Sequence, residues 1–326
     1  MQNTTTLVAG IRASGKLHIG HYLGLVKQLL ESQNNPRNNC FYFIADLHGL
    51  TTPIIPGELA QHTLEIASTY LALGIDPNKI TFFAQNHVHE HSELAWIFNC
   101  ITPLGELERM TQFKDKARQH EKHINAGLLT YPCLMGADIL LYKPTAIPIG
   151  EDQIQHVELA RVIARKFNHQ FGETFPEPKP YLREPLRIMS LTDPTKKMSK
   201  TGDEALNLDD TPEEILKKLK KAVTATEAGQ KSPGEENLMQ LLTHFGTADE
   251  SAHYKKQQAN GTLKYSELKE TLAKNIATYF AEFREKKTAL LSKPENIKEI
   301  LMEGAKKAKL TASKTLQEVK QKIGLL

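Results

Sequence analysis

The first two hundred residues alternate between short apolar runs and longer amphipathic segments, and this alternation limits the fold more than any other feature. The apolar runs have the length and composition of buried strands, whereas the longer segments carry apolar residues at helical spacing. The strand candidates are 6–11, 40–48 and 80–86, and the helix candidates are 17–32, 57–75 and 92–101. Strands that alternate with helices form a parallel sheet covered on both faces. We therefore predict an α/β fold with a Rossmann-like, doubly wound parallel sheet.

The pattern changes near Thr211, after which only helical periodicity is found. The helix candidates there are 211–225, 236–246, 266–291 and 295–324. Thr211 and Glu214 have the spacing of a capping box, and Pro212 occupies the first helical position. The sequence therefore predicts an all-helical domain at the C-terminal end.

These patterns divide the chain into three predicted parts. Residues 1–204 form the α/β domain, residues 205–295 form the helical domain, and residues 296–326 form a C-terminal helix that packs back toward the first domain. From residue 205 onward, lysine and arginine outnumber aspartate and glutamate by 21 to 17, and Arg284 is the only arginine. Lysines are flexible point charges suited to phosphates, although most such lysines belong to ordinary solvated helix faces.

Composition excludes several classes of protein. The formal net charge of +3 is too small for a polycation that coats nucleic acid. Cys40, Cys100 and Cys133 lie far apart, outside any CxxC or Cys/His cluster, so we expect buried, reduced thiols and no zinc site. No signal peptide and no apolar run long enough for a membrane span is found. These features predict a cytoplasmic protein without a membrane partner.

The stretch LHIGHYLG at 17–24 follows the first strand candidate and starts a helix. A helix N-terminus after a strand offers free N–H groups and a partial positive charge to phosphates. His18 and His21 share one helical face and can donate hydrogen bonds to phosphate oxygens. Gly20 leaves room for close approach to the backbone. The stretch matches neither GxGxxG nor a P-loop, and two ordinary surface histidines remain an alternative interpretation.

The stretch LTDPTKKMSKTGD at 191–203 has no apolar periodicity and suggests a mobile loop. Lys197 and Lys200 flank Met198 and Ser199, so the two ammonium groups are placed to stabilise charge on a polyphosphate leaving group. The alternative is a solvated, lysine-rich loop without a ligand.

HIGH followed about 180 residues later by KMSKT resembles the class I aminoacyl-tRNA synthetases, which activate an amino acid with ATP and then transfer it to tRNA. The stretches GELERMTQFKDK, GLLTYPCLMGADILLY and IGEDQIQHVEL resemble the tryptophanyl-tRNA synthetases within that class. The resemblance covers essentially the whole chain. Tyrosyl enzymes typically carry glutamine where this chain has Met135, and a thioether packs on an aromatic ring but does not pair with a phenol as an amide does.

The resemblance assigns Asp138 to recognition of the tryptophan indole. Asp138 lies in an apolar run, where a charged carboxylate needs a partner, and the indole N–H is a donor without acceptor capacity. A structural cap or ion pair is the alternative role for Asp138. The remaining residues that the resemblance places around tryptophan are Met135, Tyr131, Gln153, His48 and Val8.

The resemblance also implies an ATP site and a set of catalytic groups. The ATP-binding candidates are Arg12, Ala13, Ser14, Gly20, His21, Gly150, Glu151, Asp152, Ile188, Lys197, Met198, Ser199, Lys200 and Thr201. The catalytic candidates are Lys200, Lys197, His18, His21 and Lys116. Mg²⁺ is expected to bind mainly through ATP, near Gln112, without a dedicated protein site.

The family further implies tRNA(Trp), ATP and L-tryptophan as partners, and a homodimer to which the apolar stretch 128–141 contributes. Three departures from the bacterial pattern stand out: Arg12 replaces glutamine, His21 replaces asparagine and Thr201 replaces serine. Arg12 adds a positive charge near the triphosphate, whereas Thr201 keeps the hydroxyl.

Three alternatives stay open from the sequence. A tyrosyl synthetase shares both motifs, and Met135 argues against it. A small-molecule adenylyltransferase shares the histidine motif but is usually shorter and lacks a helical C-terminal domain. A catalytically silent paralogue that binds tRNA or tryptophan as a regulator would differ from an active enzyme in binding tryptophan without turning over ATP.

Overall fold

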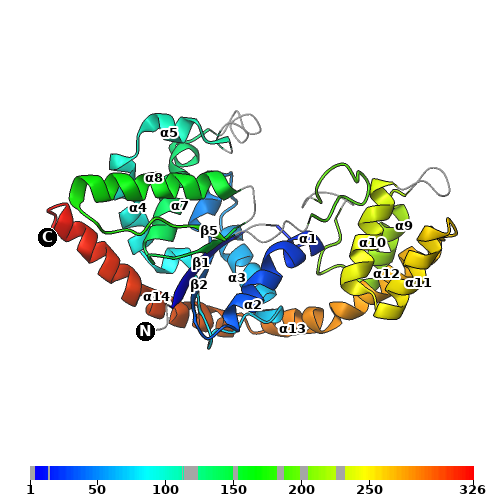
Figure 1. The fold of residues 1–326 in the computed structure, drawn as a ribbon. Coiled ribbons are helices and arrows are strands. Elements are labelled where there is room, and N and C mark those ends of the chain that lie inside the picture. The colour runs from blue at the N-terminus through cyan, green and yellow to red at the C-terminus, as the bar shows by residue number, and fades with distance from the viewer. Residues whose placement is uncertain are drawn as a thin grey trace. The chain divides into compact units, whose positions relative to one another are not determined.

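The computed structural model describes residues 4–13, 15–111, 113, 124–149, 153–181, 187–198, 205–224 and 232–326 (Figure 1). The chain forms two compact units. Unit 1 comprises Met1–Ser14, Gln28–Pro185 and Leu290–Leu326, and unit 2 comprises Gly15–Lys27 and Leu186–Ala289. Both units are discontinuous in sequence, because residues 15–27 group with the helices of the C-terminal half.

Unit 1 is built on a parallel sheet. Its strands are β1 (Thr5–Arg12), β2 (Asn38–Ala45) and β3 (Thr81–Ala84), in the spatial order β1-β2-β3. A second parallel pair is formed by β4 (Ile147–Pro148) and β5 (Pro180–Tyr181), and Ala146 bridges to Leu7 on the free side of β1. The strand candidates all form strands, and the predicted parallel α/β fold is confirmed.

Successive side chains of a strand point to opposite faces of the sheet, so they pack into different apolar cores. Phe41 and Phe43 of β2 belong to a large apolar cluster that includes residues of α4, α7 and α8. Tyr42, between them, faces the opposite way, and its hydroxyl donates to the backbone oxygen of Leu29 in α2 at 3.3 Å. Helices therefore cover both faces of the sheet, as the doubly wound prediction requires.

The candidates 57–75, 92–101 and 295–324 and the end of 17–32 form helices of unit 1, whereas the helices described between residues 104 and 171 were not predicted. The helices of unit 1 are α2 (Lys27–Gln33), α3 (Glu58–Ala72), α4 (Glu90–Ile101), α5 (Leu104–Glu108), α7 (Ala126–Leu140), α8 (Ile154–Phe171) and α14 (Pro294–Lys322), with short 3₁₀ turns η2 (Leu47–Thr51) and η3 (Gln85–His87). Among the described residues no helix is long and apolar enough to cross a membrane.

The C-terminal helix α14 lies against β3 and α4, within unit 1. The buried face of α14 carries small residues, including Gly304, Ala308 and Ala312, which let the helix approach the sheet closely. A Cβ atom on Gly304 would come within 1.7 Å of the backbone oxygen of Phe82. Gly304 is therefore required by packing, although a glycine inside a helix costs free energy relative to alanine.

Unit 2 is helical from residue 212 onward in its described part. Its helices are α9 (Pro212–Lys221), α10 (Pro233–Phe245), α11 (Ala248–Ala259), α12 (Tyr265–Tyr279) and α13 (Ala281–Leu291), the last of which ends in unit 1. The predicted capping box is confirmed: the Glu214 N–H donates to Thr211 Oγ1 at 3.2 Å, and the Thr211 N–H donates to Glu214 Oε2 at 2.8 Å. Lys269 of α12 donates to the backbone oxygen of Ala222 at 2.7 Å, at the end of α9.

The structure also corrects several sequence-based expectations. Helix α11 was not predicted, although Thr247 and Glu250 form a second capping box that marks its start. The candidate 266–291 is two helices that break at Phe280. Residues 17–32 begin as α1 (Ile19–His21), continue as the π-helical turn η1 (Tyr22–Val26) and end in α2.

The expectation of three buried thiols is wrong for one cysteine. Cys40 and Cys133 are buried, whereas Cys100 is exposed. The apolar neighbours of Cys100 belong to the buried face of α4, which includes Ile97 and Phe98, while Cys100 itself lies on the outward face with Trp96.

Gly304→Ala tests the close contact between α14 and β3. We expect a loss of about 3 kcal/mol or more in the free energy of unfolding, because the clash is with backbone and no side-chain rotation relieves it. Gly105→Ala in α5 is the matched control, since a Cβ there meets no atom within 4 Å. Urea unfolding of both variants measures the difference, and equal stabilities would contradict the assigned packing.

Candidate functional site

The sheet of unit 1 has a switch point at β1. The chain runs outward from β1 through β2 to β3, and then returns to the other side of β1 with Ala146 and β4. Ligands of open α/β sheets bind in the crevice at the carboxyl ends of the strands that flank such a point. Arg12 and Ala13, which the sequence assigns to ATP, lie at the carboxyl end of β1. The ribose-binding candidates Gly150, Glu151 and Asp152 follow β4, outside the described residues.

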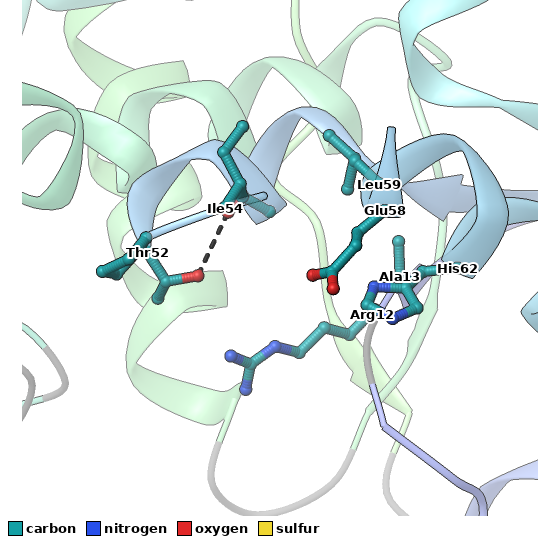
Figure 2. Close-up of a pocket in the computed structure, with 9 residues that line it drawn as sticks. Arg12, Ala13, Thr52, Ile54, Glu58, Leu59 and His62 are labelled. Carbon is teal, nitrogen blue, oxygen red and sulfur yellow. Dashed lines mark hydrogen bonds between the residues drawn. The ribbon is translucent and has the colours of Figure 1, made fainter. Parts of the chain in front are cut away.

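A cavity of about 170 Å³ opens beside the end of β1. It is lined by Arg12, Ala13, Gly49, Thr52, Pro53, Ile54, Glu58, Leu59 and His62. Figure 2 shows the Glu58 carboxylate directed toward the Arg12 side chain, with His62 beside them. Arg12 is exposed, so its cation is available at the mouth of the predicted nucleotide site. The sequence did not single out Glu58 or His62, which come from the next helix of the chain, α3.

Asp138 is a buried carboxylate that is bonded by side chains from three other elements. It lies on α7 and is 2% exposed. Its Oδ1 accepts hydrogen bonds from Gln85 Nε2 at 2.6 Å and from His91 Nδ1 at 2.6 Å. Its Oδ2 faces His48 Nε2 at 2.8 Å. The predicted pocket residues Asp138 and His48 are therefore brought together across 90 residues of sequence.

These donors keep the buried carboxylate ionised. Burial by itself favours the neutral acid, but the hydrogen bonds from His48 and His91 outweigh it and lower the pKa of Asp138 to about 2. Asp138 is thus a charged acceptor inside a largely apolar core, held by His48, Gln85 and His91.

Gln85, His91 and Tyr142 are polar partners of this site that the sequence analysis missed. Gln85 follows β3, His91 lies on α4, and Tyr142 follows the end of α7. The Tyr142 hydroxyl lies 2.8 Å from His91 Nε2. All three stand in apolar or mixed stretches, so no local signal distinguishes them from ordinary core residues.

The other predicted tryptophan contacts lie on neighbouring elements of unit 1. Tyr131 is buried about two turns before Asp138 on α7, and its hydroxyl lies 2.9 Å from His156 Nε2 of α8. Burial raises the pKa of Tyr131 to about 12, so the hydroxyl stays protonated. Met135 is half-buried on the same helix, and Val8 is buried in β1 within the same apolar cluster as α7. Gln153 forms the N-cap position of α8.

In unit 2, the first signature motif pairs with a segment far along the chain. The Ile19 N–H donates to Leu206 O, and the Leu208 N–H donates to Leu17 O, both at 2.9 Å. His18 is 3% exposed, and its ring lies 3.7 Å from that of His21, measured between ring centroids. The alternative interpretation, in which both histidines are ordinary surface residues, is therefore wrong for His18, which is buried.

The packing of neighbouring side chains explains why position 20 is a glycine. A Cβ atom at Gly20 would lie 3.0 Å from the His18 ring and 3.8 Å from Ile188 Cβ, so the missing side chain makes room for both neighbours. Ile188, the predicted adenine contact, therefore lies beside the histidine motif within one unit.

The second signature begins in a tight hairpin. The Ser190 N–H donates to Lys196 O at 2.8 Å, and the Met198 N–H donates to Ile188 O at 3.0 Å. Lys197 is exposed on this hairpin, while Met198 is buried. The Asp193 side chain organises the turn by accepting from the Thr195 backbone N–H and hydroxyl, while the mobility expected of the loop at 191–203 stays a prediction.

Nine of the predicted site residues lie outside the described residues. They are Ser14, Gln112, Lys116, Gly150, Glu151, Asp152, Ser199, Lys200 and Thr201. Within the described ranges no group of three or more histidine, cysteine, aspartate or glutamate side chains is arranged to hold a metal ion.

The chain matches a known family over most of its length. A model of the family described as tRNA synthetases class I (W and Y) matches residues 1–281. The tryptophan–tRNA ligase of Caldanaerobacter subterraneus subsp. tengcongensis is 45% identical over 98% of this chain and 98% of its own length. That of Clostridium tetani is 42% identical over 99% of this chain and 97% of its own length.

Solved structures give the same result. The tryptophanyl-tRNA synthetase of Campylobacter jejuni, complexed with ADP and tryptophan, superposes with a TM-score of 0.86 at 37% identity, over 98% of this chain and 99% of that chain. The tyrosyl-tRNA synthetase of Archaeoglobus fulgidus, complexed with L-tyrosine, shares the fold, with a TM-score of 0.66 at 20% identity over 87% of this chain and 90% of that chain.

The low pKa of Asp138 predicts an acid-sensitive contribution to stability. The ordinary pKa of about 3.9 applies in the unfolded chain, so the charged form stabilises the fold above pH 4, and this stabilisation of about 2 kcal/mol is lost as pH falls toward 2. Urea unfolding between pH 5 and pH 2.5 measures it as the difference between the wild type and Asp138→Asn. A difference that does not change with pH would contradict the assignment.

Proposed function

Because this chain belongs to the class I tRNA synthetases for tryptophan and tyrosine, we propose that it is a tryptophan–tRNA ligase. It activates L-tryptophan with ATP to tryptophanyl-adenylate and pyrophosphate, and then transfers tryptophan to the 3′ end of tRNA(Trp). The observation that carries the proposal is the likeness to tryptophan–tRNA ligases over nearly the whole of both chains. The Campylobacter neighbour, complexed with ADP and tryptophan, supports the same two ligands.

The tryptophan pocket is proposed around Asp138. A buried carboxylate held by His48, Gln85 and His91 is a fixed, charged acceptor for the indole N–H. Met135, on the same helix, supplies a polarisable thioether for the face of the ring. A site built around one hydrogen bond rejects ligands that leave its polar group unpaired, and this favours tryptophan over phenylalanine.

Activation needs no protein nucleophile. An oxygen of the tryptophan carboxylate attacks the α-phosphorus of ATP, the bond to the bridging oxygen breaks, and pyrophosphate leaves. The protein positions the two substrates and stabilises negative charge on the phosphoryl oxygens and on the leaving group. We assign this stabilisation to Lys200, Lys197, His18 and His21, with help from Lys116.

Transfer completes the reaction. A ribose hydroxyl at the tRNA 3′ end attacks the tryptophanyl carbonyl of the adenylate, and AMP leaves. Residues 1–204 are assigned to catalysis, residues 205–295 to the anticodon end of tRNA through lysine contacts to phosphates and base stacking, and residues 296–326 to the helix that completes the catalytic domain. Packing of α14 against β3 supports the last assignment.

Magnesium is proposed to enter with ATP. Mg²⁺ prefers oxygen ligands and keeps several waters, so the triphosphate and solvent supply most of its ligands. Gln112, the one protein residue predicted near the metal, lies outside the described residues. No step is assigned to the metal here, and no zinc site is proposed.

We also infer a cytoplasmic homodimer. The stretch 128–141, from which a contribution was predicted, is largely buried within unit 1 against α4 and α8. The neighbouring elements expose larger apolar side chains: Trp96 of α4 is 69% exposed and Leu104 of α5 is 58% exposed. Exposed apolar groups of this size favour burial by a partner.

The first test is ATP–pyrophosphate exchange by the purified protein with tryptophan, tyrosine or phenylalanine added separately. We expect exchange with tryptophan at least about 100-fold faster than with phenylalanine, because phenylalanine leaves Asp138 without its N–H partner. Exchange that prefers tyrosine would keep the chemistry and overturn the pocket. Tryptophan binding without exchange with any amino acid would identify a silent paralogue.

Two variants separate substrate recognition from chemistry. Asp138→Ala is expected to raise the KM for tryptophan by about 100-fold or more, because a charge-assisted hydrogen bond is lost. Lys200→Ala is expected to lower kcat for activation by about 100-fold, because charge on the leaving group loses a stabilising cation. Lys314→Ala, at an exposed lysine of α14, is the matched control and should retain both constants. An Asp138→Ala variant with an unchanged tryptophan KM would refute the pocket.

A further inference from the structure

The hydrogen bonds around Asp138 divide its two oxygens unequally. A carboxylate offers about four acceptor directions, two on each oxygen. Oδ1 receives Gln85 Nε2 and His91 Nδ1, both at 2.6 Å, so both of its directions are occupied by protein. Among the described residues, Oδ2 receives one side-chain donor, His48 Nε2 at 2.8 Å. One acceptor direction therefore remains for a ligand, and it lies on Oδ2.

The two donors on Oδ1 are themselves held in place. Gln85 is completely buried, and its Oε1 accepts the Leu47 N–H at 3.1 Å. Both the oxygen and the nitrogen of its side-chain amide are therefore hydrogen-bonded. His91 is also completely buried, and its second nitrogen lies 2.8 Å from the Tyr142 hydroxyl. His48 differs, because its side chain is 18% exposed and it lies on the short turn η2.

Asp138 and Tyr142 together determine which nitrogen of His91 carries the proton. Burial and the nearby charges of Asp138 and Glu90 raise the pKa of Tyr142 well above its usual value, so the hydroxyl keeps its hydrogen. When that hydroxyl donates to Nε2, a neutral imidazole carries its own proton on Nδ1, where it donates to Oδ1. Removing the Tyr142 hydroxyl leaves Nε2 without this donor, so only the contact with Asp138 then holds the ring.

We propose that Tyr142 and His91 are positioning residues for substrate recognition: they commit Oδ1 of Asp138 to the protein and leave Oδ2 as the atom that accepts the indole N–H. His48 shares Oδ2 with the substrate, and each uses one of the two acceptor directions of that oxygen. This inference rests on the proposed function, in which Asp138 recognises tryptophan. It adds a chain of contacts from Tyr142 through His91 to the substrate, and it names the oxygen that is used.

The test compares tryptophan with 3-benzothienyl-L-alanine, in which sulfur replaces the indole N–H in a ring of similar shape. The measurement is kcat/KM for each amino acid in ATP–pyrophosphate exchange. We expect the wild type to prefer tryptophan, and Tyr142→Phe to reduce that preference by about five- to tenfold through a higher tryptophan KM, with kcat little changed. The constants for the analogue should stay close to those of the wild type.

Tyr42→Phe is the matched control. Tyr42 is completely buried in β2 of the same unit, and its hydroxyl donates to Leu29 O at 3.3 Å, away from Asp138. This variant also loses a buried hydroxyl, but its preference for tryptophan over the analogue should match that of the wild type. A Tyr142→Phe variant that weakens both ligands equally, or neither, would overturn the inference.

Asp138→Asn gives a second test that does not depend on Tyr142. The two donors at Oδ1 require the amide oxygen in that position, which turns the amide NH₂ toward the indole N–H. We expect this variant to lose the preference for tryptophan over the analogue completely, and a retained preference would overturn the assignment of Oδ2.

The results for the wild type and the variants distinguish a failure of the proposed function from a failure of the role given to Tyr142 and His91. A wild type that shows no tryptophan-dependent exchange, or no preference for tryptophan over the analogue, refutes the proposed function. A wild type with a clear preference that Asp138→Asn loses and Tyr142→Phe retains refutes only the role of the positioning residues.

Discussion

A charged carboxylate inside an apolar core requires donors, and the need of Asp138 for them organises the middle of unit 1. The donors come from η2, from the end of β3 and from α4, while Asp138 itself lies on α7. Each element must therefore end or turn at a defined place for the charge to be satisfied. Breaking such a set of contacts is costly, because an unpaired buried charge remains. The same contacts fix the direction of the carboxylate, so the recognition that we propose for it needs no rearrangement of the core.

The parallel sheet decides where these groups can meet. The carboxyl ends of neighbouring parallel strands share one edge, so the residues that follow β1, β2 and β3 are brought close although each strand is separated from the next by a helix. His48 follows β2, Gln85 follows β3, and Arg12 ends β1. Packing among the other elements sets the distances between these groups. Helix α7 packs against both α4 and α8, and α14 packs against β3 at Gly304.

Much of the architecture could be predicted from local patterns. The strands at β1, β2 and β3, the helices α3 and α4, and the capping box of α9 follow from periodicity and from residues a few positions apart. The signature motifs and Asp138 were found through resemblance to a family, whereas the hydrogen-bond partners of Asp138 were not found. Gln85 and His91 lie 53 and 47 residues away from it in sequence, and neither stands in a distinctive motif. The outward position of Cys100 was missed because apolar neighbours in sequence occupy a different face of the helix.

The sequence by itself determined the class of fold, the all-helical C-terminal region and the family, because strand and helix periods, caps and signature motifs are properties of short stretches. Only the tertiary structure decided that residues 15–27 belong with the helical unit, that Gly304 must lack a side chain, and that His91 and Tyr142 stand behind Asp138. These are contacts between distant segments, and their energies depend on burial and on distances of a few ångströms. Periodicity carries no information about either quantity, so they are settled only when the elements pack.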